Sequence, residues 1–303
     1  MRTLVTGGAG FIGSHTVDLL IAREHEVVVV DDLSTGRREN VHPEAVLVEM
    51  DIADPELATL FHSDRFDAVV HLAAQPSVPR SIQEPLIDGR VNILGTINLL
   101  ECCRHSGVGR FVFASSAAVY GDPERVPIPE TAATRPLSPY GLTKLTAESY
   151  LRLYHDLFGL ETVALRYANI YGPRQDALGE AGVVCLFVTQ ILNGEQPLIH
   201  GDGLQTRDFV YVEDIARANL LALGPDTPAG VYNAGGGTAS TIIELFDLIS
   251  DGRAPRVHAD PRPGDIRDSV LKVSMARRAL GWQVTIPLAD GLQRTWEHFS
   301  PVG

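Results

Sequence analysis

Thr6-Gly7-Gly8-Ala9-Gly10-Phe11-Ile12-Gly13 follows a strand-like run and opens a helix-like one. Its glycines have the spacing Gly-x-x-Gly-x-x-Gly. Without Cβ atoms, this backbone can turn tightly and approach a pyrophosphate at the N-terminus of a helix. An ordinary tight strand–helix turn is the alternative, and the spacing alone leaves it open. The stretch therefore predicts the first strand–turn–helix unit of an α/β fold.

An acidic residue in the right place supports a dinucleotide at this loop. Asp31 ends the continuous β-branched run Glu26–Asp31, about 20 residues beyond the glycines. A carboxylate there accepts hydrogen bonds from both ribose hydroxyls and repels a 2′-phosphate. We therefore expect NAD rather than NADP, although Arg37 and Arg38 follow in the next loop.

Strand-like and helix-like runs alternate through the first half of the chain. This alternation is typical of a doubly wound parallel sheet with helices on both faces. The predicted strands are Arg2–Thr6, Glu26–Asp31, Ala45–Glu49, Asp67–Leu72, Arg110–Ser115 and Glu161–Arg166, and the main predicted helices are Ile12–Ala22, Pro85–His105 and Pro139–Phe158.

The regular alternation of strand-like and helix-like runs ends at about Asn169. Beyond it, Gly and Pro become frequent and the runs are shorter. We expect residues 1–168 to form an NAD-binding domain of Rossmann type, completed by about residues 213–232. Residues 169–303 are expected to form a smaller, mixed α/β domain that binds the substrate. Its expected elements are a helix at Val183–Leu192, an extended segment at Asp208–Val212 and a capping box at Thr241–Glu244.

Composition and charge exclude several classes of protein. The 303 residues are 45% hydrophobic and 21% charged, which is typical of a soluble globular protein. The formal net charge of −13 argues against nucleic acid and anionic membranes as partners. No apolar run is long enough to span a bilayer, and the first residues leave no room for a signal peptide. Cys102, Cys103 and Cys185 have neither disulfide nor zinc spacing, so we expect a cytoplasmic protein without a metal site.

Tyr140-Gly-Leu-Thr-Lys144 carries the chemistry that we expect. On a helix, side chains at this spacing leave the same face. The Lys144 ammonium would stabilise a phenolate on Tyr140, which lowers the pKa of the phenol and makes Tyr140 a general base. Tyr-x-x-x-Lys alone is common in helices. Its position downstream of the glycine loop and of Ser115-Ser116 makes it informative.

These residues belong to an ordered series that resembles the extended short-chain dehydrogenase/reductase family, and within it the nucleotide-sugar 4-epimerase branch. The resemblance covers nearly the whole chain. The motifs are Gly7–Gly13, Asp31-Asp32, Asp51-Ile52, His71–Ala74, Asn92–Thr96, Ser115–Gly121, Tyr140–Lys144, Arg166–Pro173, Gly201–Gly203, Arg207–Phe209 and Arg262–Asp265.

The resemblance implies roles for individual residues. It implies Ser116, Tyr140 and Lys144 as catalytic residues, with Lys144 also holding the nicotinamide ribose. It implies a tightly bound NAD on Gly7, Gly10, Phe11, Ile12, Gly13, Asp31, Asp32, Ser34, Thr35, Gly36, Asp51, Ile52, Leu72, Ala73, Ala74, Asn92, Ser115, Tyr140, Lys144 and Tyr167. It implies a UDP-sugar on Ser116, Tyr140, Asn169, Val183, Val184, His200, Arg207, Arg262, Asp265 and Ser269. His200 stands where the family often has an aromatic residue against uracil.

The implied activity is inversion of C4 of a UDP-hexose through a 4-keto intermediate. UDP-glucose and UDP-galactose are the expected pair, and the small Ser269 predicts some tolerance of N-acetylhexosamines. A UDP-glucuronate 4-epimerase, or another NAD-dependent enzyme of the family that modifies a nucleotide sugar, is the first alternative. An NAD-binding sensor or scaffold protein is the second.

Neighbouring residues narrow the choice within the family. Related dehydratases and decarboxylases carry acidic residues where this chain has Ala117 and Ala118, which cannot supply an acid or base. Arg174 follows Tyr-Gly-Pro as a basic residue often does in uronic-acid epimerases, but Asp176 would oppose a sugar carboxylate. The segment Gly179–Val184 instead resembles epimerases of neutral sugars.

Relatives usually dimerise through two helices of each subunit, which implies a homodimer here. The matching segments are Pro85–His105 and Pro139–Phe158, with Leu94, Ile97, Leu100 and Leu151 as apolar residues that serve either the interface or the core.

Overall fold

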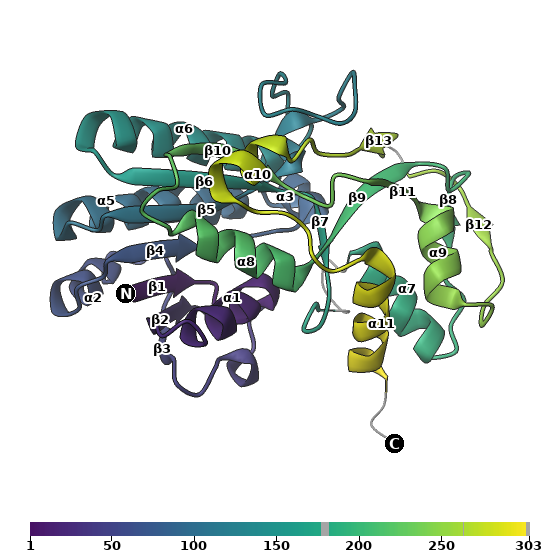
Figure 1. Ribbon diagram of the computed structural model, residues 1–303, viewed down its shortest axis with the longest axis horizontal. Coiled ribbons are helices and arrows are strands. Elements are labelled where there is room, and N and C mark those ends of the chain that lie inside the picture. The colour runs from purple at the N-terminus through teal and green to yellow at the C-terminus, as the bar shows by residue number, and fades with distance from the viewer. Residues whose placement is uncertain (177–181, 263, 301–303) are drawn as a thin grey trace.

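A seven-stranded parallel sheet forms the larger part of the protein in this computed structural model, which describes residues 1–176, 182–262 and 264–300 (Figure 1). The strand order is β10-β6-β5-β4-β1-β2-β3. The strands are β1 (Arg2–Thr6), β2 (Glu26–Asp31), β3 (Val46–Glu49), β4 (Ala68–His71), β5 (Arg110–Ser116), β6 (Glu161–Tyr167) and β10 (Gly230–Ala234). This is the doubly wound sheet that the alternating pattern predicts. The direction of winding reverses between β1 and β4, which opens a crevice at the carboxyl ends of these strands.

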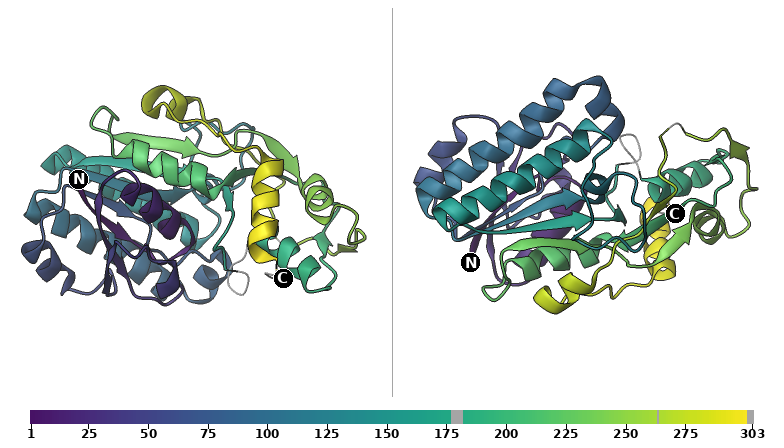
Figure 2. Two further views of the ribbon diagram at one scale, coloured as in Figure 1. Left: turned by 60° about the horizontal axis from the view of Figure 1, so that its bottom comes forward. Right: turned by 90° about the horizontal axis from the view of Figure 1, so that it is seen from above.

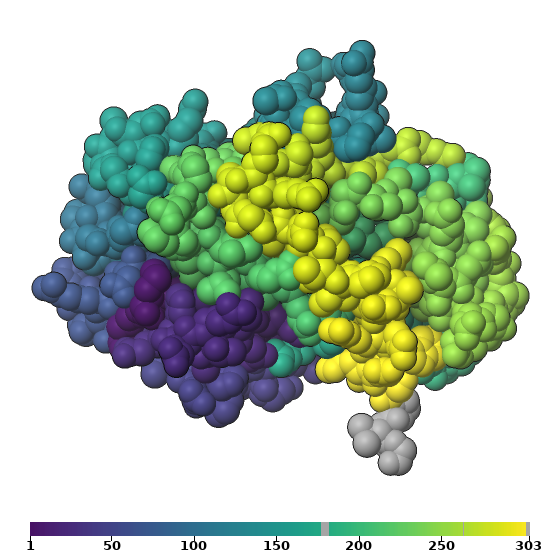
Figure 3. All heavy atoms as spheres, viewed as in Figure 1, coloured from purple at the N-terminus to yellow at the C-terminus, as the bar shows by residue number. Residues whose placement is uncertain are grey.

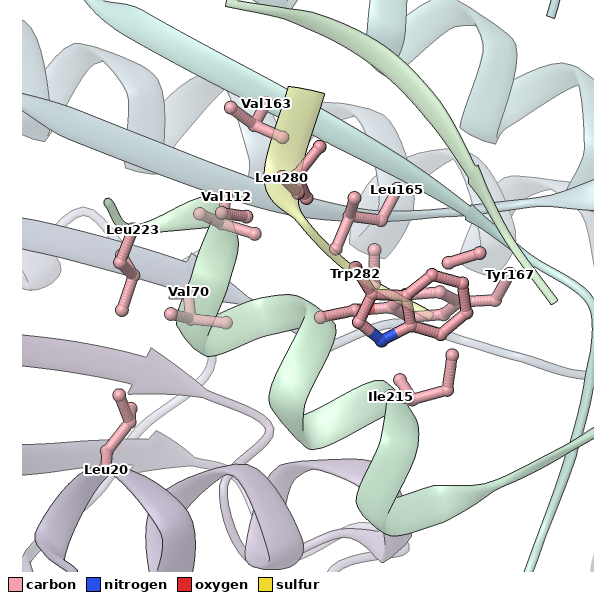
Figure 4. Close-up of a cluster of buried hydrophobic side chains, with 14 of the residues drawn as sticks. Leu20, Val70, Val112, Val163, Leu165, Tyr167, Ile215, Leu223, Leu280 and Trp282 are labelled. Carbon is pink, nitrogen blue, oxygen red and sulfur yellow. The ribbon is translucent and has the colours of Figure 1, made fainter. Parts of the chain in front are cut away.

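Helices cover both faces of the sheet (Figure 2). One face packs against α1 (Phe11–Ile21), α8 (Val212–Ala222) and α10 (Ser274–Leu280). The other packs against α2 (Leu57–Ser63), α5 (Thr96–Ser106) and α6 (Pro139–Phe158). Because both faces are buried, the central strands are nearly uniformly apolar, as Val27–Val30 is. Figure 4 shows the apolar core between the sheet and α1, α8 and α10, where the fully buried Trp282 lies beside Tyr167 and Ile215.

The second half of the chain builds a smaller part around β9 (Thr206–Tyr211). Its other strands are β7 (Asn169–Tyr171), β8 (Ile199–His200), β11 (Ala239–Thr241), β12 (His258–Ala259) and β13 (Asp268–Ser269), and its helices are α7 (Val183–Leu192), α9 (Ile242–Ser250) and α11 (Leu288–Phe299). The three helices share one apolar core with β9. In the space-filling view, the C-terminal helix lies against this part of the molecule (Figure 3).

Local signals set several boundaries correctly. Ser138 caps α6 by accepting a hydrogen bond from Gly141 N (3.1 Å), and the helix ends before Gly159, which has a left-handed φ of 71°. The capping box at α9 is present, with Thr241 Oγ1 accepting from Glu244 N and Glu244 accepting from Thr241 N.

The helix expected at Pro85–His105 is interrupted, which corrects the prediction. It consists of α4 (Pro85–Gly89), a π-helical turn at Arg90–Gly95 and α5. A further short helix, α3 (Val78–Gln83), precedes it. The side chain of Asn92 turns into the protein and bonds to Gln75, a contact that helical periodicity cannot predict. Such π-turns are frequent at functional sites.

The structure also tests the predictions for residues 208–212, the cysteines, membrane spans and metal sites. The segment expected to be extended at Asp208–Val212 is a strand that begins at Thr206, and Val212 already opens α8. The three cysteines are free and buried. In the described parts of the chain, no helix has the length and apolar character of a membrane span, and no cluster of acidic, His and Cys residues could hold a metal.

Candidate active site

A cleft of about 1130 Å³ lies at the carboxyl ends of the central strands and reaches the smaller part of the protein. Most residues predicted to bind cofactor or substrate line it. They are Gly7, Gly10, Phe11, Ile12, Gly13, Asp31, Asp32, Ser34, Thr35, Gly36, Asp51, Ile52, Leu72, Ala73, Ala74, Ser115, Ser116, Tyr140, Tyr167, Asn169, Val183 and Val184. The sheet therefore brings together residues that are far apart in the sequence.

The glycine loop is packed too tightly for side chains. Gly7 has a φ of 70°, and a Cβ atom there would lie 2.6 Å from Ala73 N. A Cβ atom on Gly13 would overlap the carbonyl oxygen of Gly7. Helix α1 begins directly after Gly10, which caps it without a side chain. Its first N–H groups are therefore free to receive an anionic pyrophosphate.

Asp31 presents a carboxylate to the same cleft at the end of β2. Its Oδ2 accepts from Ala9 N and its Oδ1 from Leu33 N, both at 2.9 Å. Burial raises the pKa of Asp31, and these two backbone N–H groups oppose that shift. The arginines that follow are engaged with acids: Arg38 pairs with Glu49, and Arg37 lies 3.8 Å from Asp176. Both arginines therefore already face acidic partners in this structure.

Tyr140 and Ser116 face the cleft, and Lys144 lies behind them. The Lys144 Nζ donates to the carbonyl oxygen of Ala114 (2.9 Å) and lies 5.8 Å from the centroid of the Tyr140 ring. Ser116 comes from the end of β5, and its Oγ accepts from Ala118 N (3.1 Å). A phenol, a serine hydroxyl and an ammonium group thus lie close together at this part of the cleft.

The pKa of Tyr140 is raised, whereas the sequence predicts that it is lowered. Burial raises this pKa most, the hydrogen bond with Ser116 lowers it, and the negative charge of Asp88 raises it further. Burial also lowers the pKa of Lys144 to about 8, and Asp88 opposes that shift. The helical spacing correctly predicts that Tyr140 and Lys144 lie on one face of the helix. It carries no information about how deeply the two side chains are buried. The protein alone therefore does not favour the phenolate, contrary to expectation.

Sequence comparison decides the family of this chain. A model of the NAD dependent epimerase/dehydratase family matches residues 3–235. The chain belongs to this family.

Solved structures extend the likeness over the whole chain. A UDP-glucose 4-epimerase with UDP-glucose from Thermotoga maritima is 45% identical, with a TM-score of 0.96 and coverage of 99% of this chain and 98% of that one. A Thermus thermophilus UDP-glucose 4-epimerase in complex with NAD is 43% identical, with a TM-score of 0.93 and complete coverage (100% of each chain). A UDP-N-acetylglucosamine 4-epimerase from Methanobrevibacter ruminantium, in complex with UDP-N-acetylmuramic acid, is 39% identical, with a TM-score of 0.93 and coverage of 98% and 97%.

Family membership, together with whole-length similarity to epimerases, identifies the protein as an epimerase that uses NAD. The cleft fits that cofactor on two counts: glycine backbone where a Cβ atom would collide, and a buried carboxylate at the end of β2. Belonging to an enzyme family also sets aside the sensor or scaffold alternative.

Other predicted residues lie outside the lining of the cleft. Asn92 is buried behind it, where its side chain accepts from Gln75 N and donates to Asp88 Oδ1. It supports the loop that follows β4. Lys144 is buried as described above.

The remaining predicted substrate contacts lie on the smaller part of the protein, outside the lining of the cleft. Arg207 and Ser269 are paired between β9 and β13, and Arg207 forms an ion pair with Asp265. His200, on β8, donates from Nδ1 to the carbonyl oxygen of Asp260 (3.0 Å), and Arg262 is exposed. Gly179, Glu180 and Ala181 of the predicted neutral-sugar motif, and Pro263, lie outside the described residues.

The cleft also has lining residues that the sequence patterns did not single out. They are Gln75, Pro76, Ser77, Arg80, Ile87, Arg90, Val91 and Gln175, among others. The signal that could have found the first three is their position in the loop after β4, because loops at the carboxyl ends of parallel strands line such sites. Arg90, within the π-turn, reaches Asp51 (2.7 Å) and could not be placed without the interruption of the helix.

Proposed function

We propose that the protein inverts C4 of a UDP-hexose through a 4-keto intermediate. The observation that carries the proposal is the meeting of Tyr140, Ser116 and Lys144 at the cleft that fits NAD. UDP-glucose and UDP-galactose are the proposed pair, and the solved relatives named as UDP-glucose 4-epimerases support this choice.

Each residue has one task in the proposed reaction. Tyr140 takes the proton of the 4-hydroxyl, and the Ser116 hydroxyl bridges the two oxygens. NAD held by the glycine loop and Asp31 would supply the hydride acceptor for C4 and the hydride for the return step. The positive charge of its nicotinamide ring would add to that of Lys144, and the two together would offset the burial that raises the pKa of Tyr140. After the sugar turns over, the opposite face of C4 would receive the hydride, which inverts C4, and Tyr140 returns the proton to the 4-oxygen.

The substrate must be held by its nucleotide while the sugar turns. We assign the diphosphate to Asn169, Arg207 and Arg262, and the uridine ribose to Asp265. Arg207 and Asp265 are already paired, so a diphosphate would share or replace the carboxylate as partner of the guanidinium. His200 and Ser269 stay proposed contacts of the base and the sugar.

Elimination is disfavoured at this site. Ala117 and Ala118 form the half-buried start of the 3₁₀ turn that follows Ser116, where an additional acid or base would have to stand. Without such groups the chemistry stops at oxidation and reduction of C4.

UDP-linked uronic acids and N-acetylhexosamines are alternative substrates. Arg174 lines the cleft and could receive the carboxylate of a uronic acid, but it is paired with Asp18 (2.7 Å). Tolerance of N-acetylhexosamines is favoured by the small Ser269 and by the related UDP-N-acetylglucosamine 4-epimerase.

We further propose a cytoplasmic homodimer with the predicted division into domains at residues 1–168 (with 213–232) and 169–303. The pairing of β10 with β6 supports a late return of the chain to the larger part. Exposed leucines on α4, the π-turn and α6 support the interface: Leu86 is 88%, Leu94 59% and Leu157 67% exposed. Leu100 and Leu151 instead belong to the core, and Ile97 is half-buried.

Proton NMR of purified protein with UDP-glucose, UDP-GlcNAc or UDP-glucuronate tests the function. We expect the galacto form of UDP-glucose to appear without added NAD, which would also support retention of the cofactor. If only UDP-glucuronate is converted, a UDP-uronic acid replaces UDP-glucose as the assigned substrate. Failure to convert any of the three, even with NAD added, would overturn the proposal.

A further inference from the structure

Helix α6 carries a third polar residue in line with the reacting pair. Tyr140, Lys144 and Glu148 are spaced four residues apart, so their side chains leave one face of the helix. All three meet the end of β5, residues Ala114–Ser116. The first two contacts belong to the site described above. The function of the third, Glu148, is unexplained by that chemistry.

Glu148 holds Ser115, the residue next to Ser116. The Ser115 hydroxyl donates to Glu148 Oε1 at 2.5 Å, and both residues are buried, at 2% and 7% exposed. Since the hydroxyl is the only polar group of this side chain, its bond to Glu148 fixes how the end of β5 sits against α6. Beyond Ser116 the sheet ends and the chain enters a 3₁₀ turn.

Arg166 in turn fixes Glu148. Its Nε donates to Oε1 (2.9 Å) and its Nη2 to Oε2 (2.6 Å), a bidentate pair with both side chains almost fully buried. Arg166 is also the β6 residue paired with Ser115 in the sheet register. Serine, glutamate and arginine therefore form a closed triangle at the end of β5.

The far side of Arg166 is equally constrained. Its Nη1 donates to the Tyr120 hydroxyl (2.9 Å), which donates to Asn233 Oδ1 (2.7 Å) on β10. Asn233 Nδ2 donates to the carbonyl oxygens of Ile128 (2.9 Å) and Lys272 (3.2 Å). A guanidinium held at both ends cannot move to a second rotamer without leaving buried polar groups unpaired.

Stability is a weak explanation for such a pair. Buried ion pairs contribute little net stability, because desolvation offsets the attraction, and apolar replacements of both partners are often tolerated. Precise placement of a reacting group is the better explanation, since a displacement of about 1 Å can cost about 100-fold in rate.

We propose that Glu148 and Arg166 are positioning residues: through Ser115 they hold the Ser116 hydroxyl against Tyr140. Neither touches the reacting atoms. The inference rests on the proposed function for its kinetic consequence, but the geometry of Ser116 and Tyr140 can be tested without turnover.

The test replaces the pair by apolar residues of similar size, Glu148→Leu together with Arg166→Met. We expect a folded protein with kcat reduced roughly 10- to 100-fold and KM little changed. In protein labelled with ¹³Cζ-tyrosine, the Tyr140 resonance should titrate at higher pH than in the wild type, because its hydrogen bond with Ser116 is weakened. Tyr140→Phe assigns that resonance.

Two further variants keep the test decisive. Ser115→Ala breaks the link but leaves the ion pair, so it should reproduce the loss of kcat even if the double variant fails to fold. Arg110→Met is the matched control: Arg110 is a buried arginine at the opposite end of β5, bonded to the carbonyl oxygens of Gly224 and Thr227. It should lower stability without changing kcat.

The outcomes separate the two hypotheses. Wild-type kcat and an unchanged Tyr140 titration in Ser115→Ala would overturn the positioning role. If the wild type itself converts no UDP-sugar, the proposed function fails, and the titration of Tyr140 still decides whether the pair positions Ser116.

Discussion

The Lys144 ammonium lies 5.8 Å from the centroid of the Tyr140 ring and donates its hydrogen bond elsewhere, to the carbonyl oxygen of Ala114. We therefore expect the lysine to act on the phenol through its charge. At the same time the bond ties α6 to β5, the strand that ends in Ser116. We expect Lys144 to act both through its charge and through the hydrogen bond that joins α6 to β5. Substitutions of Lys144 can distinguish these two effects.

Replacing Tyr140 by Phe removes the proposed base and little else. We expect kcat to fall by roughly 10²- to 10⁴-fold, as for loss of a general base, with NAD still bound. Tyr232→Phe is the control, because Tyr232 is a buried tyrosine on the edge strand whose hydroxyl donates to Pro228 O. NMR turnover assays of the two variants make the comparison, and equal activity of Tyr140→Phe and wild type would refute the assignment.

Lys144→Met should yield a more stable but less active protein at neutral pH. The pKa of Lys144 falls from 10.5 to about 8 on folding, so folding disfavours the protonated form. That cost is fully present below pH 8 and disappears as the pH rises toward 10.5. It amounts to about 3 kcal/mol, less what the bond to Ala114 contributes.

Urea unfolding of both proteins at pH 7 and at pH 10 measures this difference. We expect the advantage of Lys144→Met to shrink at the higher pH. An advantage that does not change with pH would mean that folding does not lower the pKa of Lys144. Lys144→Arg should not restore activity, because a planar guanidinium cannot occupy the ammonium's place.

Two glycines with the same backbone conformation separate strain from collision. Gly7 and Gly107 have φ values of 70° and 75°, but a Cβ atom would meet Ala73 N at 2.6 Å on Gly7 and nothing within 4 Å on Gly107. We expect Gly107→Ala to cost about 1 kcal/mol in unfolding free energy. Gly7→Ala should cost more and abolish NAD binding, measured by calorimetry. Similar losses in both would mean that the close approach to Ala73 is not required.

The parts of the fold that the sequence predicts are those with local causes. The bounds of α6 follow from Ser138, Pro139 and Gly159, each of which acts within one turn of helix. The glycine loop and Asp31 follow from the same kind of short-range pattern. Such signals do not depend on what packs against them.

The errors have tertiary causes. The π-turn depends on Asn92 reaching Gln75, which lies in a different loop. The raised pKa of Tyr140 depends on its burial in the folded protein. The pairing of Arg207 with Asp265 was also not predicted, because it depends on how the loop after β12 returns to β9; the assignment of Arg207 to phosphate stays a prediction. None of these contacts leaves a periodic trace in the sequence.

His71 predicts how the protein responds to acid. It is fully buried between the hydroxyls of Thr6 (2.7 Å) and Thr96 (3.0 Å), and burial lowers its pKa from 6.5 to about 3. The folded protein therefore holds it neutral, while the unfolded chain takes up a proton below pH 6.5. This contribution to stability is complete above pH 6.5 and is lost as the pH falls toward 3, by roughly 5 kcal/mol in total.

His71→Gln keeps polar atoms near both threonines but cannot be protonated. We expect the variant to lose less unfolding free energy than the wild type between pH 6.5 and pH 4, in urea titrations at several pH values. His62→Gln, at an exposed position on α2, serves as the control and should leave the slope unchanged. Because stability changes with pH only where the folded and unfolded states bind different numbers of protons, equal slopes for wild type and His71→Gln would show that other groups cause the acid sensitivity.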